Sequence, residues 1–171
     1  AAIQPSSTSS LNDMSVVSAP DALSVRVRPV SVQTPATRAL EGSDLSFSLV
    51  QTEPASSAEQ SAASQGIAIG QLLRTIVIRR GARDYVFVLV PAGRQLDWPR
   101  LRAHLGVNRL SLPDQDEAKE ATGYERGAIT PFGSTTPWPV IADASVAGRG
   151  AVAIGGGARG VNLHADADAL I

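Results

Sequence analysis

The sequence predicts one compact α+β domain with helices and strands in mixed order. Stretches of alternating or wholly apolar residues, typical of strands, recur between stretches bounded by helix-capping residues and glycines. The 171 residues are 43% apolar and 18% charged, which is the composition of a chain with a buried core. We expect residues 31–171 to form this domain. Residues 1–30, rich in Ser, Ala, Pro and Val, form a predicted N-terminal extension.

Four segments carry the signals of helices. Each begins with a Ser, Thr or Asp whose side chain can accept a hydrogen bond from the first turn, and most end at a glycine. Asp114 and Glu117 form a capping-box-like pair, and Gly123 suits the left-handed end of that last helix. The predicted helices span residues 34–42, 57–65, 97–106 and 114–123.

The strand signals are of two kinds. Leu45, Phe47 and Leu49 alternate as one half-buried strand does, whereas residues 85–90 are apolar on both faces and predict a central, buried strand. A short glycine-containing segment separates that run from residues 74–79, so the two predict a hairpin. The remaining predicted strands span residues 140–141, 151–154 and 161–163.

Several classes of protein are excluded by residues that the chain lacks. It contains no cysteine and two histidines, so disulfides, thiolate nucleophiles and cysteine-rich zinc sites are ruled out. The serine-elbow and P-loop patterns are absent. No stretch approaches the ~18 apolar residues of a membrane span. We therefore expect a cytoplasmic protein with no metal, no cofactor and no membrane partner.

The glycine run near the C-terminus matches the spacing G-x-G-x-x-G, from Gly155 to Gly160. That pattern binds a dinucleotide only where a helix opens at its last glycine. Here Val161 begins an apolar stretch that favours a strand, so a nucleotide cofactor is not expected. We expect His104 to lie on a helix surface, and we favour a structural role over a catalytic one for His164.

The positive charge is almost entirely arginine, and the net charge is −1. Four arginines fall close together at positions 74, 79, 80 and 83. Arginine binds phosphate through its planar fork, so this cluster predicts either contacts with a nucleic-acid backbone or a solvated hairpin edge. The low net charge gives no support for a broad DNA-binding surface.

Residues 123–133, Gly-Tyr-Glu-Arg-Gly-Ala-Ile-Thr-Pro-Phe-Gly, are the most informative loop. Three glycines and a proline fix an irregular backbone path, and Phe132 can form the wall of a small cavity. The alternative is an ordinary surface loop.

Five landmarks in order resemble the YbaK family and the related editing domain of bacterial prolyl-tRNA synthetases, over roughly residues 31–171. They are the helix at 57–65, the strand beginning Leu-Arg-Thr-Ile-Val at 73, the Val-Leu-Val-Pro segment at 88–91, the loop at 123–133 and the glycine run ending at Gly160. The resemblance implies a mixed, curved, barrel-like sheet with flanking helices.

The resemblance also implies an activity: metal-independent hydrolysis of the ester between tRNA and a wrongly attached small amino acid, of the class Ala, Cys, Ser, Thr or Pro. The implied partners are the acceptor end of aminoacyl-tRNA and, as a further candidate, a synthetase. Arg74 and Gly127 are the implied catalytic positions. The implied substrate-binding residues are Ile129, Thr130, Pro131, Phe132, Gly133, Gly155, Gly156 and Gly157.

Two positions depart from the family pattern. Arg74 stands where relatives carry a functionally important lysine, and Gly155 stands where they often have serine. Arginine stays protonated and cannot act as a general base, but it can bind a phosphate or a carbonyl through two hydrogen bonds. The sequence therefore leaves two hypotheses: a freestanding trans-editing hydrolase, and a non-catalytic module that binds a tRNA end or a small ligand.

Overall fold

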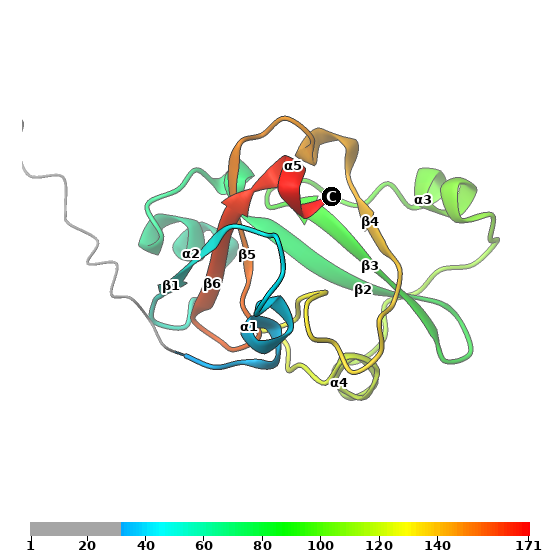
Figure 1. Ribbon diagram of the computed structural model, residues 1–171. Helices are drawn as coiled ribbons and strands as arrows, with labels where there is room; N and C mark the ends of the chain where they lie inside the picture. Colours follow the sequence, from blue (N-terminus) through cyan, green and yellow to red (C-terminus); the bar gives the residue numbers. More distant parts are fainter. Residues whose placement is uncertain (1–31) are drawn as a thin grey trace, which may run out of the picture.

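The computed structural model describes residues 32–171, so the predicted extension at 1–30 lies outside the described residues. The chain forms two three-stranded sheets with short helices around them (Figure 1). The elements are α1 (Pro35–Leu40), β1 (Phe47–Gln51), α2 (Ala58–Ser64), η1 (Ile69–Gln71), β2 (Leu73–Gly81), β3 (Asp84–Pro91), α3 (Trp98–Leu105), α4 (Gln115–Thr122), β4 (Val140–Ala142), η2 (Ala144–Val146), β5 (Ala151–Gly155), β6 (Val161–Asp166) and α5 (Ala167–Leu170).

The sheet arrangement confirms the α+β class. One sheet has the order β1-β6-β5 with antiparallel pairs, and the other has the order β2-β3-β4, in which β4 runs parallel to β3. The two sheets do not close into the barrel that the resemblance implied. Between them, the described residues show a single bridge, from Leu72 to Ala153. The first three residues of β2, from Leu73 to Thr75, line a pocket and do not pair with β5.

The helix ends follow the capping residues of the sequence. The Thr34 hydroxyl accepts a hydrogen bond from the Thr37 N–H at 3.1 Å, and Gly106 and Gly123 adopt the left-handed conformation that ends α3 and α4. The capping box predicted for α4 is only half formed. Asp114 caps the helix, but Glu117 contacts β2 and β3 instead of returning to the cap.

The core is continuous over both faces of β3. All residues from Tyr85 to Pro91 are buried, which confirms the prediction of a central strand. One face carries Val86, Val88 and Val90 against α3, while Phe87 on the other face packs with Ala121 of α4. These two helices therefore cover opposite faces of the β2–β3 hairpin (Figure 1). Within residues 32–171, no helix has the length and apolar character needed to cross a membrane.

The C-terminal glycine run connects two paired strands. β5 and β6 form an antiparallel hairpin, and β6 begins at Val161 as predicted, so no helix opens there to receive a dinucleotide. His104 is exposed on α3, as predicted. His164 is half-buried, its Nε2 lies 2.8 Å from Gln65 Oε1, and burial lowers the pKa of this imidazole. Its contact therefore joins β6 to the C-terminal end of α2.

Candidate functional site

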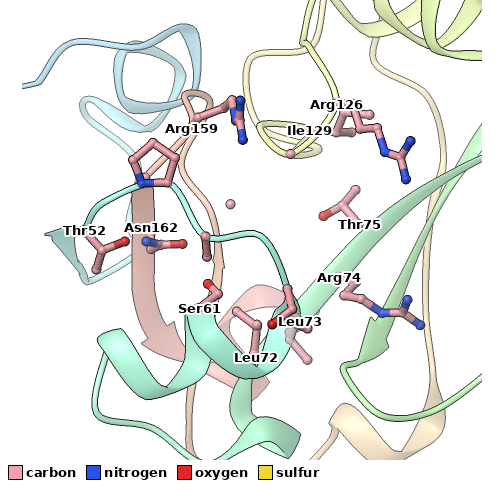
Figure 2. A pocket seen from close by; sticks show the side chains of 17 residues that line it. Thr52, Ser61, Leu72, Leu73, Arg74, Thr75, Arg126, Ile129, Arg159 and Asn162 are labelled. Atoms are coloured by element: carbon pink, nitrogen blue, oxygen red, sulfur yellow. The ribbon is translucent and has the colours of Figure 1, made fainter.

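A pocket of about 340 Å³ lies between α2, the first residues of β2, the loop at 123–133 and the β5–β6 turn (Figure 2). Four segments that are distant in the sequence thus meet around one space. The lining residues are Thr52, Pro54, Ala55, Ser57, Ala58, Ser61, Leu72, Leu73, Arg74, Thr75, Arg126, Gly127, Ile129, Gly155, Arg159, Gly160 and Asn162.

The charged side chains around this pocket are all basic. Arg74, Arg126 and Arg159 line it, and no aspartate or glutamate of residues 32–171 does. The other polar lining residues are uncharged Ser, Thr and Asn. The rest of the lining is apolar or glycine, for example Leu73 and Ile129. The arginines favour a ligand with an anionic or strongly polar part, because guanidinium groups present fixed donors to phosphate and carbonyl oxygens.

The structure brings four of the ten sequence-predicted site residues to the pocket. Arg74, Gly127, Ile129 and Gly155 are among its lining residues. The other six belong to the loop or to the β5–β6 turn but do not line the pocket. They are Thr130, Pro131, Phe132, Gly133, Gly156 and Gly157.

Contacts of two of these residues, Phe132 and Gly156, explain their places. Phe132 packs against the core cluster that includes Leu40, and its carbonyl accepts a hydrogen bond from the Tyr124 hydroxyl at 2.6 Å. The carbonyl of Gly156 accepts one from Thr34 Oγ1, also at 2.6 Å. The segments around the pocket are thus fastened to α1. In the structure these residues hold the loop and the β5–β6 turn in position. Their contact with a substrate stays a prediction.

Arg74 lies at the rim of the pocket, on the exposed side of β2. Its Nη2 donates a hydrogen bond to the Arg94 carbonyl at 2.8 Å, and Figure 2 shows its guanidinium turned away from the centre of the pocket. Because neighbouring side chains of a strand point to opposite faces, Thr75 points the other way, toward Ile129 (Figure 2).

Thr75 is a pocket residue that the sequence reasoning missed. Its Oγ1 is buried and has no hydrogen-bond partner among the described residues. A buried hydroxyl without a partner is costly in a folded protein, so it marks a place where a ligand or water is expected to bind. Strand alternation would have placed Thr75 on the face opposite Arg74, but the sequence alone does not show which face meets the loop.

Other missed lining residues had weaker signals. Ser57 and Ser61 are four apart and share one face of α2. Asn162 is a polar residue within the otherwise apolar start of β6, and its Nδ2 donates to the Val50 carbonyl at 3.4 Å. Arg126 precedes Gly127, and Arg159 precedes Gly160 at the end of the glycine run; neither arginine was predicted to be a site residue.

The loop places a backbone donor at the pocket. Gly127 has a φ of +87°, in a turn closed by a 3.0 Å hydrogen bond from the Ala128 N–H to the Glu125 carbonyl. The N–H of Gly127 makes no hydrogen bond within residues 32–171. Because a β-branched residue is a strong outlier at this φ, Gly127→Val would also strain the turn. A lost activity in that variant would therefore not by itself identify the donor.

Gly155 permits a close approach between β5 and the same loop. A Cβ at this position would lie 3.0 Å from the carbonyl oxygen of Ile129. A serine here, as the family pattern has it, would require the loop to move by a few tenths of an ångström. Glycine at position 155, where the family pattern has serine, therefore suits the close contact between β5 and the loop in this pocket.

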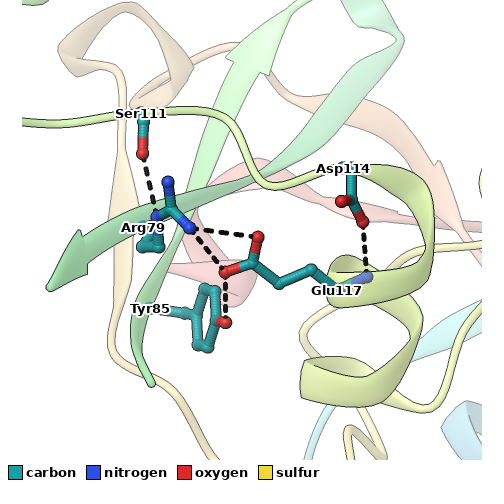
Figure 3. A network of polar contacts seen from close by, with 5 residues as sticks. All are labelled: Arg79, Tyr85, Ser111, Asp114 and Glu117. Atoms are coloured by element: carbon teal, nitrogen blue, oxygen red, sulfur yellow. Dashed lines mark hydrogen bonds and ion pairs between the residues drawn. The ribbon is translucent and has the colours of Figure 1, made fainter. Parts of the chain in front are cut away.

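A partly buried polar network fastens α4, from which the loop starts, to the hairpin (Figure 3). Arg79 Nη1 donates to both carboxylate oxygens of Glu117 at 3.1 and 3.2 Å, and the Tyr85 hydroxyl donates to Oε1 at 2.6 Å. Ser111 Oγ accepts a hydrogen bond from Arg79 Nε at 3.0 Å. The hydrogen bond to Glu117, helped by burial, raises the pKa of Tyr85 to about 12.

The raised pKa of Tyr85 predicts a loss of stability at alkaline pH. Since folding favours the neutral phenol, its contribution is complete below the unfolded pKa of 10.0 and disappears as pH rises through about 12. The free energy of unfolding should therefore fall across this interval. In Tyr85→Phe the fall should be smaller, leaving the part due to Tyr124, whose pKa burial also raises. Urea unfolding at several pH values, with tyrosinate absorbance, measures both; equal slopes would contradict the assignment.

No group of three or more His, Asp or Glu side chains in the described part of the chain could hold a metal ion. The polar groups that line the pocket are arginine guanidinium groups, Ser and Thr hydroxyls and the Asn162 amide.

Comparisons with known proteins agree with this architecture. Residues 52–171 match the family model of the aminoacyl-tRNA editing domain. Over 106 residues the chain is 32% identical to the multifunctional Ser/Thr-tRNA deacylase ProXp-y of Escherichia coli K12, covering 60% of this chain and 62% of that protein.

Two further relatives extend the comparison. A proline–tRNA ligase of Thermosipho melanesiensis is 31% identical over 85 residues, which are 50% of this chain and 15% of the ligase. The solved structure of a proposed trans-editing enzyme for prolyl-tRNA synthetase aligns with a TM-score of 0.72 and 27% identity, covering 82% of this chain and 91% of that one. With a family model matched over most of its length, the chain belongs to the aminoacyl-tRNA editing domain family.

Proposed function

We propose that this chain is a trans-editing deacylase, which hydrolyses the ester between tRNA and a wrongly attached small amino acid. The observation that carries the proposal is the pocket itself, a space of about 340 Å³ lined by three arginines. Within the described part of the chain it has no carboxylate in its lining, and the Thr75 hydroxyl has no hydrogen-bond partner. Its place in a family of editing domains supports the same reading.

Hydrolysis of this ester requires few catalytic groups from the protein. An aminoacyl ester is already activated, and the neighbouring ribose hydroxyl can help to position the attacking water. The protein must hold the ester and stabilise the oxyanion that forms on its carbonyl. In our proposal the N–H of Gly127 donates to that oxyanion, and Thr75 orients the aminoacyl group through its Oγ1.

The size of the pocket suits a small amino acid joined to a ribose. About 340 Å³ is near the lower end of small-molecule sites. A synthetase discriminates by only ~1 to 3 kcal/mol per methylene, so a second pocket sized for the smaller intruder is useful. The acceptor end of tRNA is the partner we propose, in the cytoplasm, where tRNA is charged.

The decisive experiment is a panel of charged tRNAs carrying alanine, cysteine, serine, threonine or proline. We expect at least one ester to disappear faster with the protein than in buffer, and chelation of metals to leave that rate unchanged. If no ester is hydrolysed faster than in buffer while the uncharged tRNA still binds, the chain is the non-catalytic binding module instead.

A further inference from the structure

A second hollow of about 390 Å³ lies at the far end of β2, beside the hairpin turn. Residues 109–111 reach the edge of β2 there, where Arg79 and Ser111 form a bridge. The lining residues are Arg79, Arg80, Gly81, Arg109, Leu110 and Ser111. We call this hollow the basic pocket.

The arginines of the basic pocket keep unused donors. Arg79 is held by Glu117 and Ser111 through Nη1 and Nε, and its Nη2 makes no hydrogen bond to another described residue. Arg80 donates to Asp84 through Nη2 at 2.7 Å, and its Nε is buried without a partner among the described residues. Arg109 is exposed and makes no side-chain hydrogen bond or ion pair within residues 32–171.

These contacts point to an anionic ligand. The carboxylates of Glu117 and Asp84 offset two of the three charges, so one uncompensated guanidinium remains beside two that are already oriented. An arginine held by a neighbour loses less freedom when it binds an oxyanion, so the basic pocket is prepared for a phosphate.

The basic pocket and the 340 Å³ pocket of the candidate site, here called the site pocket, are both lined by residues of β2. Thr75 and Arg79 are four residues apart on one face of β2, a separation of about 13 Å, and Arg74 and Arg80 are about 20 Å apart. β2 is one of the two edge strands of its sheet, and its residues line both hollows. A ligand that reaches both must be a chain, roughly four or more nucleotides long if it is a helical nucleic-acid strand.

We propose that the basic pocket binds backbone phosphates of the tRNA acceptor arm while the aminoacyl ester occupies the site pocket. This inference rests on the proposed function. It gives the arginine cluster of the hairpin a task in holding the RNA body, separate from the chemistry at Thr75 and Gly127. The contact is to phosphate, so it adds affinity for any tRNA without selecting the amino acid.

The test is Arg109→Ala, because this side chain is exposed and makes no hydrogen bond or ion pair within residues 32–171. Two substrates carry the same amino acid, the one hydrolysed fastest in the panel: charged tRNA, and the aminoacyl ester of adenosine, which has no phosphate. We expect kcat/KM for charged tRNA to fall about 3- to 10-fold and the rate for the adenosine ester to stay unchanged. Arg109→Lys should restore most of the loss.

A salt titration adds a readout that a structural effect would not change. Binding of uncharged tRNA should weaken in Arg109→Ala, and the slope of log K against log salt concentration should become shallower by about 1. The matched control is Arg100→Ala, which removes the same charge from the exposed surface of α3, outside both hollows, and should leave slope and rate as in the parent protein.

The possible results distinguish failure of the phosphate contact from failure of the deacylase proposal. Equal losses on both substrates, or an unchanged salt slope, would overturn the phosphate contact while leaving the deacylase proposal intact. If neither ester is hydrolysed by the parent protein, the deacylase proposal fails, and the slope for uncharged tRNA still decides whether the basic pocket binds RNA.

Discussion

Arg74→Ala is expected to lower the rate of ester hydrolysis roughly 10- to 100-fold. A hydrogen bond to a charged group contributes ~1.5 to 3 kcal/mol, and a loss of that size from the transition state gives this factor. Arg74 lines the pocket rim, and its present bond to the Arg94 carbonyl at 2.8 Å holds it beside the opening. We infer that the guanidinium exchanges this carbonyl for the substrate's phosphate or carbonyl.

The control for this prediction is Arg74→Lys, which restores the residue of the family pattern at an exposed position. Single-turnover hydrolysis of charged tRNA should remain within a few-fold of the parent rate in this variant. Circular dichroism and thermal unfolding should be unchanged in both. Full activity of Arg74→Ala would show that the hydrolytic site does not use this side chain.

Gly133→Ala is expected to produce the largest loss of stability, about 2 to 5 kcal/mol. Gly133 has a φ of +67°, which costs an L-residue about 1 to 2 kcal/mol. A Cβ there would also overlap the carbonyl group of Pro35. Either the loop or α1 must move, at a further cost of about 1 to 3 kcal/mol.

Gly42→Ala measures the backbone contribution alone, so the difference between the two variants gives the contribution of the overlap with Pro35. Gly42 has a similar φ of +76°, but a Cβ there meets no atom within 4 Å. Urea unfolding should therefore show a loss of only about 1 to 2 kcal/mol in this variant. Equal losses in the two variants would mean that the contact between the loop and α1 contributes nothing to stability.

Local signals in the sequence determined most of the elements. Asp97 with Gly106, and Thr34 with Pro35, marked helix ends because capping depends on residues a few positions apart. The wholly apolar run at 85–90 marked the central strand because burial on both faces leaves no polar alternation. Glu117 was the exception: its local pattern predicted a capping box, but Arg79 and Tyr85 offered it a buried partner.

The sequence by itself predicted the α+β class and marked the loop at 123–133, because both depend on patterns of neighbouring residues. The family resemblance assigned Arg74, Gly127, Ile129 and Gly155 to one site, and the structure places these four at one pocket. Only the tertiary structure decided that Thr75 faces the pocket and that Phe132 and Gly133 do not line it. It also separated the hairpin arginines from Arg74 along β2. The reason is physical: a pocket is assembled from segments far apart in the chain, and which face of a strand meets them depends on packing that no local pattern records.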